Sequence, residues 1–320
     1  MPACRFLSCL LEPAYFAGQG LAVMMTRSTG RSRCLRVLFT DTVPMSFVQF
    51  LRSSHVHVGG LFLALTLIAP AASAQPAQKP LRIAVIPSVA NEATELAIAQ
   101  AKTEGLAVEL VEFSDWVMPN TAVQEGAVDA NFFQHAPFLA RYNAASGARL
   151  EPIAYGYSTT IGLFSKKLKR GDPMPDGARI AIPSDPVNTG RALLLLQSIG
   201  LITLKTGVTH EATLADITAN PKKLTFVQIE GSQAARSFDD VTASVTYTTF
   251  AKHGGLDEKD GLAFDNGDPE NVKRYAIRWV ARADRAQDPR LLRFIAIYQQ
   301  SAPVKTTLKR LYGDLIDFPW

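Results

Sequence analysis

The sequence predicts an α/β fold in which strands and helices alternate and most strands run parallel. Short apolar segments with strand character recur along the chain, and segments with apolar residues at helical spacing lie between them. Neither an internal repeat nor a long linker interrupts this order. Such alternation is typical of layered domains in which helices cover a largely parallel sheet.

The folded part is expected to open with a strand, a helix and a second strand. Residues 81–86 (LRIAVI) form a short apolar run that Pro87 ends, which is the pattern of a buried strand. Residues 91–102 carry apolar residues at helical spacing. Residues 108–113 (VELVEF) alternate between apolar and polar side chains, as a half-buried strand does.

Later segments continue the alternation to the end of the chain. Strands are expected over residues 178–182, 224–229, 241–247 and 275–280, and helices over residues 189–199, 289–300 and 304–311. The loops between them are short and carry ordinary turn residues, such as Gly171-Asp172-Pro173. This order again favours helices packed on parallel strands.

The first part of the chain is expected to be a targeting segment and not part of the fold. Residues 61–69 (LFLALTLIA) form an apolar run between Arg52 and Ala72-Ser73-Ala74, which is typical of a secretory signal peptide cut after Ala74. The alternative, a transmembrane anchor, needs about 20 apolar residues. We therefore predict a signal peptide over residues 45–74. Residues 1–44 are expected to be an upstream extension from a wrongly placed start codon, or a disordered leader.

The cysteines are confined to the leader. Cys4, Cys9 and Cys34 all precede the predicted cut. The chain after the cut therefore has no thiol for a structural disulfide, a cysteine-bound metal or a lipid anchor. We accordingly expect a soluble exported protein without a lipobox cysteine.

Charge and motifs argue against several classes of function. The formal net charge is only +4, and the basic cluster at residues 166–170 has no interleaved aromatics, so we expect no nucleic-acid partner. The chain lacks the G-x-S-x-G, H-E-x-x-H, P-loop and G-x-G-x-x-G motifs. Two of the five histidines, His55 and His57, lie in the leader. We therefore predict no catalytic site, no metal site and no cofactor.

One arginine stands at an unusual place, the start of an expected helix. In residues 184–196 (SDPVNTGRALLLL), Asp185 or Asn188 can cap the helix, and Pro186 suits its first turn. The positive end of the helix dipole disfavours a cation, so Arg191 is expected to have a negative partner. That partner is either a ligand carboxylate or phosphate held by the guanidinium fork, or a nearby Asp or Glu.

Aromatic and polar side chains gather after predicted strand ends. Residues 129–138 (DANFFQHAPF) mix aromatic rings with hydrogen-bonding groups, and residues 113–116 and 155–157 add further rings. Each ring taken alone suits a core position, but a small-molecule pocket combines apolar walls with a few placed polar groups. Since ligands of open α/β sheets bind at strand ends, we expect these segments to line a ligand pocket.

Several stretches resemble one known family, in the order VELVEFSDWVMPN, GAVDANFFQHAPFL, FSKKL, IAIPSDPVNTGRALLLLQSIGLI, ITANPKKL and RSFDD. The family is that of the substrate-binding proteins of methionine ABC importers, of the NlpA/MetQ type, and the resemblance runs from residue 81 to the C-terminus. It implies a type II-like, two-lobed periplasmic binding protein with the ligand cleft between lobes joined by crossover strands. It also implies a monomer without enzymatic activity or cofactor, which delivers methionine or a related amino acid to an inner-membrane permease with its ATPase.

The resemblance leads to expected domain bounds and an expected location. Residues 75–160 and 246–320 are expected to form lobe 1 and residues 161–245 lobe 2, with crossings near residues 157–162 and 242–248. Many family members are lipoproteins. This chain is nevertheless expected to be a periplasmic protein that is secreted by its signal peptide and carries no lipid anchor.

The resemblance also implies a set of ligand contacts. The family's arginine that holds the ligand carboxylate corresponds to Arg191, with Asn188 beside it. The remaining expected pocket residues are Trp116, Phe133, His135, Phe138 and Tyr247. Tyr247 stands where family members commonly have asparagine, so a different carboxylate or a sulfur-containing ligand is the alternative to methionine. A more distant alternative is recruitment of the fold as a non-transport protein, such as an enzyme or an adhesin.

Overall fold

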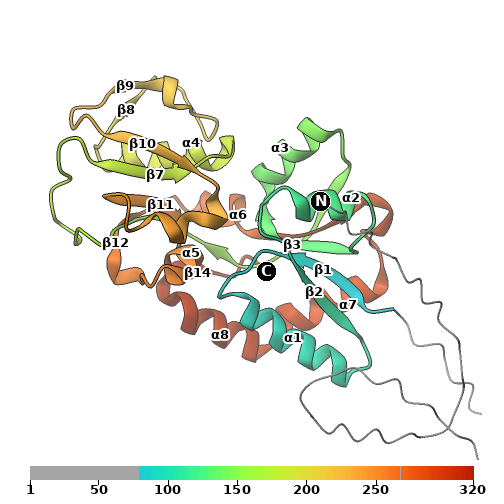
Figure 1. Cartoon of the computed structure of the whole chain (residues 1–320). Helices are drawn as coiled ribbons and strands as arrows, with labels where there is room; N and C mark the ends of the chain where they lie inside the picture. Colours follow the sequence, from blue (N-terminus) through green and yellow to red (C-terminus); the bar gives the residue numbers. More distant parts are fainter. Residues whose placement is uncertain (1–78, 267) are drawn as a thin grey trace, which may run out of the picture. The chain divides into compact units, whose positions relative to one another are not determined.

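The computed structural model describes residues 79–266 and 268–320. The predicted upstream extension, the signal peptide and the three cysteines lie outside the described residues. Within those two ranges, no helix is long and apolar enough to cross a membrane. Two five-stranded sheets with helices packed on them make up most of the described chain (Figure 1).

The first sheet has the strand order β2-β1-β3-β13-β4. Its strands are β1 (Leu81–Val85), β2 (Val108–Glu112), β3 (Ala130–His135), β4 (Leu150–Tyr155) and β13 (Ile277–Arg282). Strand β1 is parallel to β2 and β3, whereas β13 is antiparallel to β3 and β4. Strand β13, which comes late in the chain, thus lies in a sheet whose other strands come from the first part of the described residues.

Helices cover both faces of this sheet. Helices α1 (Asn91–Thr103), α7 (Pro289–Gln300) and α8 (Ala302–Tyr312) pack against one another beside it (Figure 1), and α2 (Met118–Gln124) and α3 (Ala136–Ser146) cover the other face. Helix α1 buries Ala93, Ala97 and Ala101, whose helical spacing puts three small side chains on one face. In the core, the ring of Trp279 stacks on Phe132 with centroids 3.9 Å apart. Such a pair adds about 0.5–1.5 kcal/mol beyond its buried area.

The second sheet has the order β10-β7-β11-β6-β12. Its strands are β6 (Ile161–Phe164), β7 (Arg179–Pro183), β10 (Thr225–Ile229), β11 (Ala243–Tyr247) and β12 (Gly261–Phe264). Strand β7 is parallel to β10 and β11, and β6 is antiparallel to β11 and β12. Helix α4 (Pro186–Ser198) packs on β7 and buries Leu193, Leu195 and Leu196 in the core of this sheet.

The chain passes from the first sheet to the second between β4 and β6, and returns between β12 and β13. The short strand β5 (Ser158–Thr159) lies on the first passage and pairs with β14 (Ile316–Asp317), and α6 (Glu270–Arg274) lies on the return. The second sheet therefore continues to residue 264, past residue 245 where lobe 2 was expected to end. Strand β11 lies in the middle of the sheet and forms no crossing, because β12 follows it and pairs with β6.

The elements expected from the sequence are confirmed, with bounds that differ by three residues or fewer. The expectation of mostly parallel strands is wrong, because β6, β12 and β13 pair antiparallel and make both sheets mixed. Short strands such as β6 (IGLF) and β12 (GLAF) were not expected. They carry too few residues for a period to be read.

Candidate functional site

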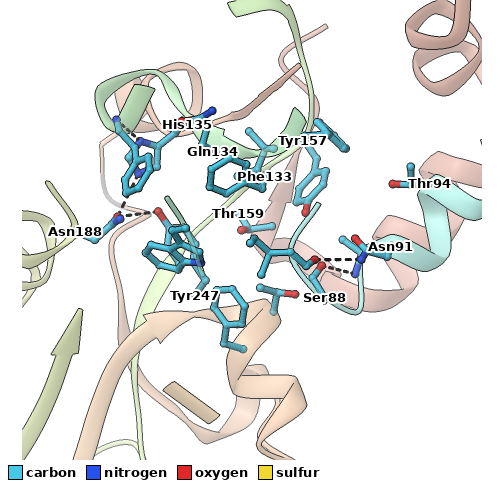
Figure 2. A pocket seen from close by; sticks show the side chains of 18 residues that line it. Ser88, Asn91, Thr94, Phe133, Gln134, His135, Tyr157, Thr159, Asn188 and Tyr247 are labelled. Atoms are coloured by element: carbon cyan, nitrogen blue, oxygen red, sulfur yellow. Dashed lines mark hydrogen bonds between the residues drawn. The ribbon is translucent and has the colours of Figure 1, made fainter. Parts of the chain in front are cut away.

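A pocket lies where residues of the two sheets meet (Figure 2). Its wall is largely aromatic, and the rings of Trp116, Phe133, Phe138, Tyr247 and Phe250 contribute to it. The ring of Trp116 packs edge-on against Phe138 and Tyr247, with centroids 6.0 and 6.1 Å apart. Among the described residues, the lining contains no Asp, Glu, Lys or Arg.

Many of the lining residues lie at the carboxyl ends of strands, where an α/β sheet offers loops and helix starts to a ligand. Asn91 begins the helix that follows β1, and Trp116 follows β2. His135 ends β3, Asn188 lies in the first turn of α4 after β7, and Tyr247 ends β11. Loops and helix starts of both sheets therefore meet in one place.

A hydrogen-bond network joins the polar residues at one side of the pocket. The hydroxyl group of Tyr247 donates to Asn188 Oδ1 at 2.9 Å, and His135 Nε2 lies 3.2 Å from the same oxygen. The amide nitrogen of Asn188 donates to the carboxylate of Asp185, which caps α4. The backbone N–H of Phe138 donates to His135 Nδ1, so we assign the imidazole proton to Nε2, which then donates to Asn188.

His135 is neutral in this setting. Burial, and after it the positive charge of Arg191, lower the pKa of His135 from 6.5 to about 3. Burial also raises the pKa of the Tyr247 phenol above its usual value. The polar side of the pocket therefore presents neutral hydrogen-bonding groups near neutral pH.

Arg191 contacts this network without lining the pocket. Its Nε donates to Asp265 Oδ2 at 2.6 Å, and its Nη1 donates to the hydroxyl oxygen of Tyr247 at 3.2 Å. The guanidinium also stacks on Tyr275, 3.8 Å from the ring centroid. Burial disfavours the charge, but the Asp265 carboxylate and both phenols outweigh it, so the pKa of Arg191 is raised.

Asp265 is the negative partner that was expected for Arg191. The expected reason is wrong, however, because α4 begins at Pro186 and Arg191 lies past its first turn, where the helix dipole acts. The second oxygen of Asp265, Oδ1, accepts from the backbone N–H of Ile161 at 3.0 Å. The ion pair is buried, with the side chains of Arg191 and Asp265 only 4% and 10% exposed. The pair therefore fastens α4 to both passages of the chain between the sheets.

The structure brings six of the seven predicted site residues into one pocket, namely Trp116, Phe133, His135, Phe138, Asn188 and Tyr247. Arg191, the seventh, lies outside the lining and reaches the pocket through the hydroxyl group of Tyr247. Ser88, Asn91 and Thr249 line the pocket without having been predicted. Ser88 and Asn91 follow the first predicted strand, so the strand-end rule could have found them.

Lowering the pH from 7 to 4 is expected to destabilise the fold through His135 by on the order of 2–3 kcal/mol. Below pH 6.5 the unfolded imidazole takes up a proton, whereas the folded one, with a pKa of about 3, stays neutral. Between these values the unfolded chain binds more protons, so stability falls as pH falls. Urea unfolding of the wild type and of His135→Asn, whose side chain can still cap α3, measures the difference in slope. Equal slopes would contradict the assignment.

Comparison with known proteins gives consistent matches. The family model described as NlpA lipoprotein matches residues 81–317. The D-methionine-binding lipoprotein MetQ of Salmonella typhi is 37% identical over 240 residues, which cover 74% of this chain and 87% of that protein. Outer membrane lipoprotein 2 of Mannheimia haemolytica is 37% identical over 251 residues, 78% of this chain and 90% of that protein.

Solved structures agree with these relatives. The crystal structure of the methionine binding protein MetQ has a TM-score of 0.71 and 36% identity, covering 75% of this chain and 98% of that chain. A nutrient binding protein from Burkholderia cenocepacia bound to methionine has a TM-score of 0.69 and 34% identity, covering 75% and 100%. The predicted fold class, a two-lobed α/β binding protein, is confirmed by these matches.

The relatives correct one prediction. Both the MetQ relative and the Mannheimia haemolytica relative are named lipoproteins, as is the matching family model. The expectation of a soluble periplasmic protein without a lipid anchor is therefore overturned. It rested on the apolar run at residues 61–69 and on the positions of Cys4, Cys9 and Cys34, all of which lie outside the described residues.

Proposed function

The chain belongs to the NlpA lipoprotein family, and we propose that it is the substrate-binding component of an ABC importer for methionine or a closely related amino acid. The observation that carries this proposal is the aromatic pocket with a neutral hydrogen-bond network at the strand ends of both sheets. A relative named for D-methionine binding and a solved neighbour bound to methionine support the ligand class. The partner in this proposal is a membrane permease with its ATPase, and the chain performs no chemistry itself.

The proposed binding role of each group follows from the chemistry of the pocket. The aromatic walls suit an apolar side chain, because such pockets hold ligands by burial and orient them with a few polar groups. His135, Asn188 and Tyr247 are proposed to hold the amino-acid head group by neutral hydrogen bonds. Arg191 adds positive potential beside Tyr247 without lining the pocket. The family resemblance implies that Arg191 contacts a ligand carboxylate directly. Such a contact would require Tyr247 to move.

A ligand that bridges both sheets is expected to stabilise the closed arrangement, as in hinge closure of two lobes. Contacts between the two sides already exist beside the pocket. Ser232, which follows β10, donates its hydroxyl group to the backbone oxygen of Ser114, which follows β2, at 2.8 Å. Ligand binding and closure are therefore proposed to be coupled.

A thermal unfolding screen of the purified protein, stripped of bound ligand by unfolding and refolding, tests the proposal. Methionine at about 100 times its Kd is expected to add about 2.7 kcal/mol of stability, because it binds the folded form alone. A shift with another carboxylate and none with methionine would keep the binding role and change the ligand. No shift with any amino acid, dipeptide or sulfur-containing organic anion would contradict the proposal.

A further inference from the structure

A second cavity, of about 690 Å³, is lined by residues of α4 and of the segment that returns from β12 to β13. It shares no lining residue with the aromatic pocket described above. Leu194, Leu195 and Phe264 form the apolar part of its wall. The charged or titratable part of the lining includes Arg191, His210, Asp265, Asp268 and Arg274.

Arg191 offers this cavity hydrogen-bond donors that the protein does not use. The residue is only 3% exposed. Its Nε donates to Asp265 and its Nη1 to Tyr247, but Nη2 donates to no group within residues 79–266 and 268–320. Because Arg191 lines the second cavity and not the aromatic pocket, Nη2 is accessible from the second cavity. A buried guanidinium group with unused donors suits a carboxylate or phosphate oxygen.

Asp265 leaves this donor free. Its Oδ2 accepts from Arg191 Nε at 2.6 Å, and its Oδ1 accepts from the backbone N–H of Ile161 at 3.0 Å. Both carboxylate oxygens therefore have a partner, and only one nitrogen of Arg191 is taken up by the pair. The ring of Tyr275, 3.8 Å below the guanidinium, holds the plane of that group in place.

Arg274 adds a second cation at the opening of the cavity. Its side chain is exposed, its Nη1 donates to Asn271 Oδ1 at 3.4 Å, and it forms no ion pair with the described residues. The remaining acidic side chain of the lining, Asp268, is exposed and caps the backbone N–H of Glu270 at 3.0 Å. The cations therefore lie at both the buried and the exposed part of the lining.

We propose that the second cavity binds a small organic anion. Its phosphate or carboxylate group would pair with Arg191 Nη2 and with Arg274, and its apolar part would pack against Leu194, Leu195 and Phe264. The room in the cavity favours such a molecule over a bare ion. This site is separate from the aromatic pocket, and the inference does not depend on the ligand proposed for that pocket.

Calorimetry of the ligand-free protein at constant ionic strength, with chloride as the only other anion, tests this inference. The probes are phenyl phosphate, inorganic phosphate and benzyl alcohol, which carry both parts of the expected ligand, the anion alone and the apolar part alone. Phenyl phosphate is expected to bind with a Kd on the order of 1 mM or below, and each of the other probes at least about tenfold more weakly. Phenyl phosphate that binds no more tightly than benzyl alcohol would overturn the inference.

Charge variants locate the site. Arg274→Gln is expected to raise the Kd of phenyl phosphate about tenfold. Asp268→Asn, whose amide oxygen can still cap Glu270, is expected to lower it by about twofold to fivefold. The matched control is Arg141→Gln, which makes the same change in net charge at an exposed arginine of α3 outside both linings. Equal weakening by Arg274→Gln and Arg141→Gln would mean that only net charge attracts the anion, and the inference would be wrong.

A third variant blocks the site from within. Leu194 lies one turn after Arg191 on α4 and lines the cavity, so the carboxylate of Leu194→Glu can reach the guanidinium group. This variant is expected to lose phenyl phosphate binding, and far-UV circular dichroism checks that it folds. Retained binding by a folded Leu194→Glu protein would contradict the proposed site.

Titrations with methionine separate this inference from the proposed function. Phenyl phosphate is expected to bind with saturating methionine present, because the two linings share no residue. If methionine displaces phenyl phosphate, the anion lies in the aromatic pocket and the inference alone fails. If phenyl phosphate binds and responds to the variants but no amino acid binds, the proposed function alone fails.

Discussion

Replacing Arg191 by alanine is expected to destabilise the fold by about 3 kcal/mol, before any effect on ligand binding. The substitution leaves the Asp265 carboxylate, 10% exposed, without its cation, and takes the Nη1 donor from the hydroxyl oxygen of Tyr247. Removing one partner of a buried ion pair is costly because the remaining charge stays buried, without its hydration and without a counter-charge. Urea unfolding of the ligand-free protein measures the loss.

The matched control removes both charges. Arg191→Met combined with Asp265→Asn keeps much of the volume and leaves no buried charge, so more than half of the lost stability is expected to return. An Arg191→Ala protein within about 0.5 kcal/mol of the wild type would show that the pair contributes little. The double variant is also the proper background for ligand titration, because weak binding by Arg191→Ala alone can arise from damage around Asp265.

Arg191 shows how far local sequence reasoning extends. Its expected place at a helix start predicted a negative partner, and the structure contains one. Because α4 begins at Pro186, Arg191 lies past the first turn, and burial of the guanidinium, not the helix dipole, accounts for the partner. The identity of that partner could not be predicted, because Asp265 lies 74 positions away and joins the site only through the return of the chain from β12. The same return of the chain places Tyr275 against the guanidinium of Arg191. No short sequence pattern predicts this contact.

The elements of the fold likewise divide into features that local sequence predicts and features that it does not. Elements with a clear period, such as α1 and β2, were predictable because their apolar residues fall on one face. Strand direction was not, because the pairing of β13 with β3 and β4 depends on a passage between sheets after residue 264. The pocket was largely predictable because strand ends are local features.

Gly231 marks a close approach of the two sides of the pocket. It follows β10 of the second sheet, whereas Trp116 follows β2 of the first. A Cβ atom at Gly231 would lie only 2.0 Å from the Trp116 ring. That ring is 8% exposed and packs against Phe138, Tyr247 and Phe250, so it cannot simply turn away. Only glycine fits here without displacing the aromatic wall.

Gly231→Ala is therefore expected to weaken methionine binding by about 10- to 100-fold, since overpacking of this kind costs about 1–3 kcal/mol. Calorimetric titration measures the loss, and urea unfolding of the ligand-free protein gives the reference. If the two sides meet mainly when ligand is bound, the affinity falls while the ligand-free stability changes by less than about 0.5 kcal/mol. An equal loss in both would mean that the contact belongs to the resting fold.

A second substitution decides whether the clash is the cause. Trp116→Leu alone is expected to weaken binding, because it removes part of the aromatic wall. Added to Gly231→Ala, it makes room for the new methyl group, so the double variant should bind at least as tightly as Gly231→Ala alone. Strictly additive losses would show that Gly231 acts through its backbone. A sub-additive result would identify the Gly231 and Trp116 contact as the place where ligand binding and closure are coupled.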